Sequence, residues 1–235
     1  MAYLNKVRQT LESLVAQVEN HFDIKVGEIP LRTYEQFLAD ITEEYKAEAK
    51  KPETVAEKAK YWIGEKAKKL AAKTHLKGNF FEYKGRIYVN QDRQIKDKNE
   101  LKRILMHEAG HAAARKLNPA FEDYDPVKEK HLIYLSEGFA DYLSIDFLFE
   151  LSKDDESMKK HLQKTANKKH DMIYRCKFTA MKHDEFAKSH CMGYEFMYKL
   201  HQLKGKEGVI AAMKNPPSMA ELEEPYLRGI LKCQK

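Results

Sequence analysis

The chain has 235 residues, of which 43% are hydrophobic and 33% are charged, so we expect a folded protein with a core rather than a disordered one. The net charge of +6 arises from lysines mixed with glutamates, and no nucleic-acid-binding signature accompanies it. The three cysteines have no metal-ligand spacing, the first residues do not resemble a signal peptide, and no long apolar run follows. These features predict a cytoplasmic protein without disulfides and without a membrane-spanning segment.

Residues 1–75 are expected to form an N-terminal helical region. Apolar residues recur at helical spacing over residues 3–21, which predicts a first helix. A second helix is expected to begin at Thr33, because Gln36 follows three residues later, as in a capping box. A third is predicted over residues 52–74. The sequence does not indicate whether this region regulates the protein, docks a substrate or mediates oligomerisation, and it does not indicate the oligomeric state.

The residue pattern changes at position 79. Segments 79–83 and 86–90 are rich in aromatic and β-branched residues and flank Lys84 and Gly85, an arrangement typical of a β-hairpin. No other segment has a clear strand pattern, so the sheet is expected to be small. The predicted fold class is therefore α+β, predominantly α.

Two consecutive helices are expected to carry the chemistry. Asp97, with Glu100 three residues later, begins the first of them in the manner of a capping box, and Pro119 follows its end. The second, at about residues 128–151, is strongly apolar. Further helices are predicted over the polar residues 152–188, over residues 189–203 with an end at Gly205, and after Ser218.

Residues 107–111 read His-Glu-Ala-Gly-His. Positions four apart lie on one face of a helix, so His107 and His111 can direct their ring nitrogens to a single Zn²⁺ ion. Glu108 is rotated from that face and can reach a zinc-bound water without itself binding the metal. The alternative is that these three residues lie on the surface of an amphipathic helix and bind no metal.

The apolar helix also contains two carboxylates, Glu137 and Asp141, on one face. Burying an unpaired carboxylate costs several kcal/mol, and a zinc ion or an imidazole N–H would offset that cost. Glu137 is therefore expected to be the third zinc ligand. Asp141 is expected to accept a hydrogen bond from the far ring nitrogen of a ligand histidine, with His107 as the expected donor. Alternatively, both acids face solvent or pair with lysines.

The segments His-Glu-Ala-Gly-His and Glu-Gly-Phe-Ala-Asp, which begin at His107 and Glu137, together resemble the gluzincin, or thermolysin-like, zinc metallopeptidases. The resemblance covers about residues 79–214. It implies a zincin-like catalytic domain at residues 76–235, in which a zinc-bound water activated by Glu108 hydrolyses peptide bonds.

The same resemblance implies a strand above the site, at the edge of the sheet, that pairs with the substrate. In this chain that strand would be the second half of the hairpin, and the substrate-binding residues would be Tyr88, Val89 and Asn90.

The later segment 190–196 resembles a helix of small thermolysin-like peptidases, in which a tyrosine often stands three residues before a glycine. Here the glycine is Gly193, and His190 occupies the tyrosine position. Hydrolysis of a peptide bond passes through a tetrahedral oxyanion that needs a hydrogen-bond donor. His190 is the first candidate for this catalytic role, and Tyr194, one helical turn further on, is the second.

The chain also departs from the family pattern. Twenty-five residues separate His111 from Glu137, more than in the best-known members, and Leu117 stands where a metzincin would have a third histidine. A Gly-x-Met-x-Asn aminopeptidase motif is missing, so an endopeptidase that acts on peptides or proteins is expected. Two other hypotheses are a catalytically inactive, zinc-containing gluzincin-like module that binds polypeptides, and a basic interaction protein in which the motif occurs by chance. The intact Glu108 favours the peptidase, because a structural zinc needs no base.

Overall fold

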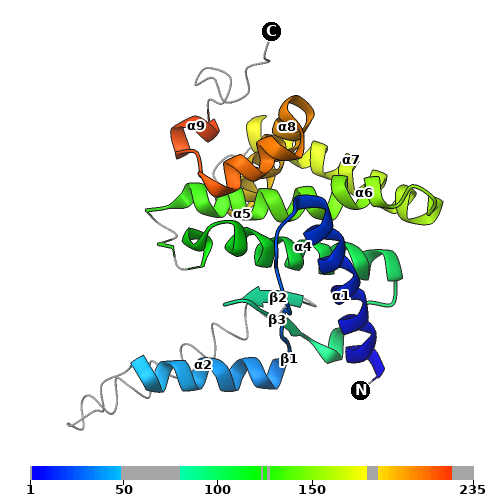
Figure 1. Cartoon of the computed structure of the whole chain (residues 1–235), viewed down its shortest axis with the longest axis vertical. Coiled ribbons are helices and arrows are strands. Elements are labelled where there is room, and N and C mark those ends of the chain that lie inside the picture. The colour runs from blue at the N-terminus through cyan, green and yellow to red at the C-terminus, as the bar shows by residue number, and fades with distance from the viewer. Residues whose placement is uncertain (1, 49–79, 123, 126–127, 179–184, 224–235) are drawn as a thin grey trace.

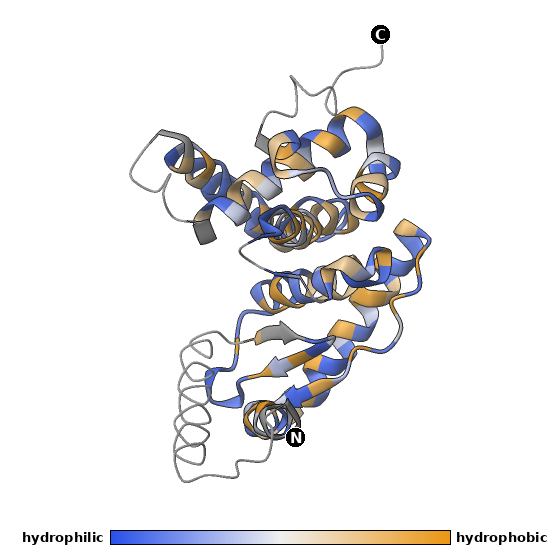
Figure 2. Ribbon diagram, turned by 90° about the vertical axis from the view of Figure 1, so that its left-hand side faces the viewer, coloured by the Kyte–Doolittle hydropathy of each residue, from blue (hydrophilic) through white to orange (hydrophobic). Residues whose placement is uncertain are grey.

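The computed structural model describes residues 2–48, 80–122, 124–125, 128–178 and 185–223, so the helix predicted over residues 52–74 lies outside the described residues. The described elements are helices around a small sheet, which confirms an α+β protein that is predominantly α. Helix α4 (Lys98–Leu117) lies between the sheet on one side and helix α5 (Lys130–Tyr142) on the other, and Figures 1 and 2 show this layering from two directions. None of the described helices combines the length and the apolar character that a membrane crossing requires.

The N-terminal helix α1 (Ala2–Phe22) packs against α4. Its buried residues recur at the spacing expected from the sequence and belong to the same hydrophobic cluster as residues of α4 and α5. The buried residues are Val7, Leu11, Leu14, Val15, Val18 and Phe22. The boundary predicted at residue 75 lies outside the described residues, and the described parts on both sides of it share this cluster.

The sheet has three strands, β1 (Leu31–Thr33), β2 (Phe80–Tyr83) and β3 (Arg86–Val89), in the order β1-β3-β2. Strands β2 and β3 are antiparallel and form the predicted hairpin. Lys84 and Gly85 have φ values of 46° and 77°, the left-handed conformation that a tight hairpin turn requires. Strand β1 pairs with β3 in parallel and was not predicted.

Helix α2 (Tyr34–Glu48) begins where the sequence predicted. The backbone N–H of Thr33 donates to the side chain of Gln36 (2.7 Å), and the N–H of Gln36 donates back to the Thr33 hydroxyl (3.4 Å), which completes a capping box. The hydroxyl of Tyr88 donates to Asp40 at 2.7 Å, so α2 is tied to the central strand of the sheet.

Glycines allow the helices around the site to approach closely. A Cβ atom at Gly110 of α4 would lie 2.7 Å from the Cα atom of Ala140 in α5. A Cβ atom at Gly138 would lie 2.2 Å from the carbonyl carbon of Gly193. Any larger residue at either glycine would push the backbones apart. The distance between α4 and α5 therefore depends on Gly110. The distance between α5 and the helix that carries Gly193 depends on Gly138.

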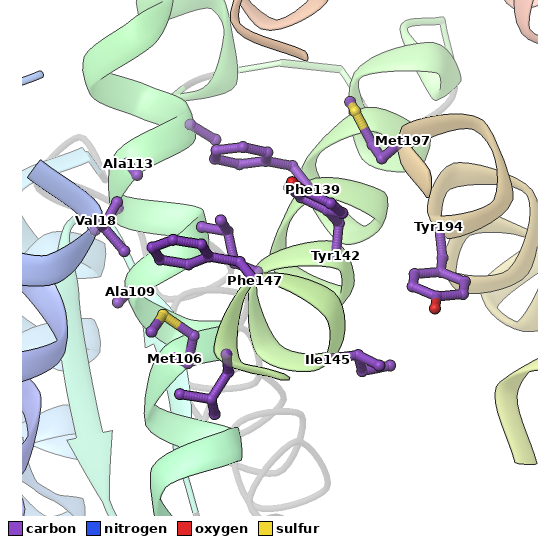
Figure 3. Packing of buried hydrophobic residues seen from close by; sticks show 14 of the residues in the cluster. Val18, Met106, Ala109, Ala113, Phe139, Tyr142, Ile145, Phe147, Tyr194 and Met197 are labelled. Atoms are coloured by element: carbon purple, nitrogen blue, oxygen red, sulfur yellow. The ribbon is translucent and has the colours of Figure 1, made fainter. Parts of the chain in front are cut away.

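A π-helical turn (Leu143–Phe147) interrupts the apolar helix predicted at residues 128–151, and α6 (Leu148–Leu151) continues after it. Phe139, which precedes this turn, and Phe147, its last residue, both lie in the core between α4 and α5 (Figure 3). The ring centroid of each is 5.7 Å from that of Phe22 in α1. The N-terminal helix thus covers the same core that supports the predicted zinc ligands.

Helix α7 (Glu156–Phe178) and helix α8 (Glu185–Lys214) form the outer layer, and α9 (Met219–Glu223) follows. The predicted helix end at Gly205 is confirmed, because that glycine has a non-helical backbone (φ 64°, ψ −166°) and the remainder of α8 is a second helical segment that begins after it. The buried thiols of Cys176 in α7 and Cys191 in α8 are free and lie 3.1 Å apart, where the two helices pack against each other.

Candidate metal centre

Helices α4 and α5 bring three side chains to one point. The Nε2 atoms of His107 and His111 are 3.2 Å apart. The Oε2 atom of Glu137 is 3.5 Å from the first and 3.6 Å from the second. The sequence predicted that these residues would meet, and the structure places them together.

This spacing suits one metal ion. Four ligands at the corners of a tetrahedron, each about 2.1 Å from a central ion, lie about 3.4 Å from one another. The three separations between His107, His111 and Glu137 each differ from that value by about 0.2 Å or less. The group could therefore hold a metal ion, and no other such group was found among the described residues.

The charges in the cluster are strongly perturbed. Burial favours a neutral Glu137, but His111, His107 and His190 outweigh it and lower the pKa of this carboxyl to about 2. Burial lowers the pKa of His111 to about 4. Burial acts in the same sense on His107, but Asp141 and Glu137 overcome it and raise the pKa of His107 to about 10. Without an ion, the cluster at neutral pH therefore contains a carboxylate, a neutral imidazole and an imidazolium.

The far ring nitrogen of each histidine faces a polar side chain. Nδ1 of His107 lies 3.2 Å from Oδ1 of Asp141, the partner expected from the sequence, but without the geometry of a hydrogen bond. Nδ1 of His111 lies 2.9 Å from the hydroxyl oxygen of Ser136. Ser136 was missed, although its place directly before Glu137 was a signal that could have found it. Such contacts fix the tautomer and orientation of a ligand ring.

Asp141 has two further contacts, which come from the outer helices. His190 of α8 places Nδ1 2.9 Å from Oδ2 of Asp141 and Nε2 3.4 Å from Oε2 of Glu137. The rings of His190 and His107 are stacked, with centroids 5.9 Å apart. Lys169 of α7 forms an ion pair with the same Oδ2 atom. The sequence offered no signal for Lys169, which is one of six lysines on α7.

The candidate base, Glu108, lies inside the protein next to these groups. Its side chain is buried, with 7% of the residue exposed. Its negative charge contributes to the raised pKa values of His107 and Arg103. A carboxylate in this place is near the metal group while remaining outside the set of ligands.

The hydroxyl of Tyr194 lies in the core rather than at the candidate metal site. Although it follows His190 by one helical turn, it is fully buried in the core. Its ring is stacked with that of Tyr198. Its hydroxyl is beside Asp146, whose pKa is raised by burial to about 6, and Tyr194 partly counteracts that rise. A hydroxyl enclosed by the core cannot donate to a substrate, so the expectation that Tyr194 supports the oxyanion is wrong.

The predicted substrate strand is also wrong. Strand β3 lies in the middle of the sheet, and β1 and β2 already pair with its two edges. Tyr88 and Val89 are completely buried. Asn90 uses its side chain to accept from the N–H of Asp92 and so caps the next turn. Within the described sheet, β2 is the outer strand on the side of α4 (Figure 1).

Comparisons with protein-family models, with curated proteins and with solved structures each returned no match. The chemistry of the cluster is therefore inferred from its geometry.

Proposed function

We propose that this protein is a zinc-dependent peptidase of the gluzincin type that cleaves bonds within polypeptides. The observation that carries the proposal is the meeting of His107, His111 and Glu137 at tetrahedral spacing beside a buried Glu108. Two imidazoles and one carboxylate, with a fourth position left for water, are a ligand set of catalytic zinc. A structural zinc site would use four protein ligands and would need no adjacent base.

The chain's own groups supply the acid–base steps. When bound, zinc would polarise the scissile carbonyl group and lower the pKa of the attacking water. Glu108 would take a proton from that water and pass it to the leaving nitrogen. In its doubly protonated form, His190 would donate its Nδ1–H to Asp141 and its Nε2–H to the oxyanion, which stabilises the charge that develops during attack.

The substrate is proposed to bind along the outer strand β2 rather than along β3. An extended peptide can add to the edge of a sheet through backbone hydrogen bonds, and β2 contacts α4, the helix that carries the two histidines. A cytoplasmic location is part of the proposal, since the three cysteines of the chain are odd in number and have no metal-ligand spacing.

Zinc analysis combined with a cleavage assay tests the proposal. The purified chain should contain one zinc ion and should cleave an unstructured protein such as casein until a chelator removes the metal. Glu108→Gln should keep the zinc and lose activity by about 10²- to 10⁴-fold, the usual contribution of general acid–base catalysis. Glu150→Gln, at an exposed glutamate of α6, should behave like the wild type. Zinc binding without cleavage by the wild type would instead support the inactive polypeptide-binding module.

A further inference from the structure

Asp141 of α5 is the point where three other helices, α4, α7 and α8, meet α5 at the candidate site. Its carboxylate is almost completely buried, with 4% of the residue exposed. Oδ1 faces His107, the metal ligand, while Oδ2 faces both His190 and Lys169. One carboxylate therefore contacts the candidate metal ligand His107 through Oδ1 and the candidate oxyanion donor His190 through Oδ2.

Lys169 differs in kind from the other two partners of Asp141. A histidine that ligates a metal must be neutral, so His107 contributes no positive charge once an ion is bound. Lys169 brings an ammonium group into contact with the buried carboxylate, and its side chain is only 11% exposed. A buried carboxylate keeps a defined position when its partners are both charged and well placed.

The surroundings of Lys169 restrict its ammonium group. Nζ lies 5.9 Å from the centre of the Tyr194 ring, on the side of α8. Helix α7 is itself anchored to α4, because His161 lies 2.9 Å from Glu100 and the Asn99 side chain donates to Ser157 at 2.9 Å. Lys169 therefore extends from a fixed helix, and Tyr194 acts as part of its packing.

We propose that Lys169 is a positioning residue that pins Oδ2 of Asp141, so that this carboxylate holds His190 at the position where it meets the substrate oxyanion. The inference rests on the proposed peptidase function and extends it to a residue that does not touch the reacting atoms. Because Lys169 shares Oδ2 with His190, whereas His107 contacts Oδ1, loss of its charge disturbs His190 more than it disturbs metal binding.

The test replaces Lys169 with methionine, which keeps the length of the side chain and removes the charge. We expect Lys169→Met to retain zinc and to lower kcat by about 10- to 100-fold, with little change in KM. Lys169→Arg restores a positive charge and should give a higher kcat than methionine. Lys168→Met, at the neighbouring exposed lysine of α7, is the matched control and should match the wild type.

A spectroscopic readout separates this role from general stabilisation. Long-range ¹H–¹⁵N NMR of the histidine rings should show the Nδ1–H of His190 hydrogen-bonded in the wild type and in Lys168→Met, and altered in Lys169→Met, while the ring signals of His111 stay unchanged. If the wild type binds zinc but cleaves nothing, the proposed function fails, and this readout still decides the position of His190.

Three results would overturn the inference. The first is an unchanged kcat in Lys169→Met, and the second is a His190 signal that does not respond to the substitution. The third is failure of both Lys169→Met and Lys169→Gln to fold, which would make Lys169 a residue of the scaffold rather than one that positions His190.

Discussion

The hydroxyl oxygen of Ser136 lies 2.9 Å from Nδ1 of His111, so a residue of α5 orients the second candidate histidine ligand on α4. We predict that Ser136→Ala weakens zinc binding by about 10- to 100-fold, because the ring of His111 loses the contact that fixes its tautomer. Competition with a fluorescent zinc chelator measures the affinity. Ser13→Ala, at an exposed serine of α1, should have no effect. An affinity equal to that of the wild type would show that the contact is not needed.

Zinc binding should release one proton near neutral pH. The pKa of His107 is raised to about 10 in the ion-free protein, so its ring is protonated at pH 7 and must lose the Nε2 proton to bind a metal. His111, with a pKa lowered to about 4, and Glu137, with one of about 2, are already deprotonated. Affinity should therefore fall by about tenfold for each pH unit between pH 9 and pH 7.

Isothermal titration calorimetry in buffers with different ionisation enthalpies measures this proton directly. The slope of the observed enthalpy against the buffer enthalpy should correspond to about one proton released for each zinc bound. A slope of zero would mean that His107 is already neutral before the metal arrives.

Tyr194→Phe should retain wild-type cleavage. The hydroxyl is buried beside Asp146 and away from solvent, and the ring that packs near Lys169 is preserved in phenylalanine. Measurement of kcat and KM for Tyr194→Phe and for the wild type tests this prediction. A decrease in kcat of more than about 100-fold, as expected for a missing oxyanion donor, would show that Tyr194 is a catalytic residue after all.

Gly138→Ala should destabilise the fold, although alanine normally favours a helix by about 1 kcal/mol over glycine. The added Cβ atom would lie 2.2 Å from the carbonyl carbon of Gly193, and backbone cannot move aside as a side chain can. The free energy of unfolding should fall by more than the roughly 1–3 kcal/mol typical of an overpacked core. Urea denaturation measures it, and an unchanged midpoint would mean that α5 and α8 can separate at no cost.

The parts of the fold that depend on local chemistry could be predicted from the sequence. Thr33 with Gln36 and Lys84 with Gly85 each act within a few residues, so the start of a helix and the turn of a hairpin could be inferred from them alone. Glu137 could also be predicted, because an acid on an apolar helix needs a partner wherever that helix packs.

The parts that depend on distant packing could not be predicted. Strand β1 has three residues, too few for a periodic pattern, and its pairing partner is more than fifty residues away. That one strand converts β3 from an edge strand to a central one and so excludes Val89 and its neighbours from substrate pairing. Likewise, Tyr194 shares a helical face with His190, and only the docking of α8 directs one of them to the site and the other into the core.

The four helices that contribute to the site are synthesised in two pairs, first α4 and α5 and then α7 and α8. A growing chain that has completed α4 and α5 already contains the three candidate metal ligands and Glu108, but it lacks Lys169 of α7 and His190 of α8. Under the proposed function, a ribosome-bound fragment that ends after α5 would lack the candidate oxyanion donor and the helix α8 that packs against α5, so it could not cut neighbouring nascent chains. Proteolytic competence would then begin only when the last of these helices has emerged and docked.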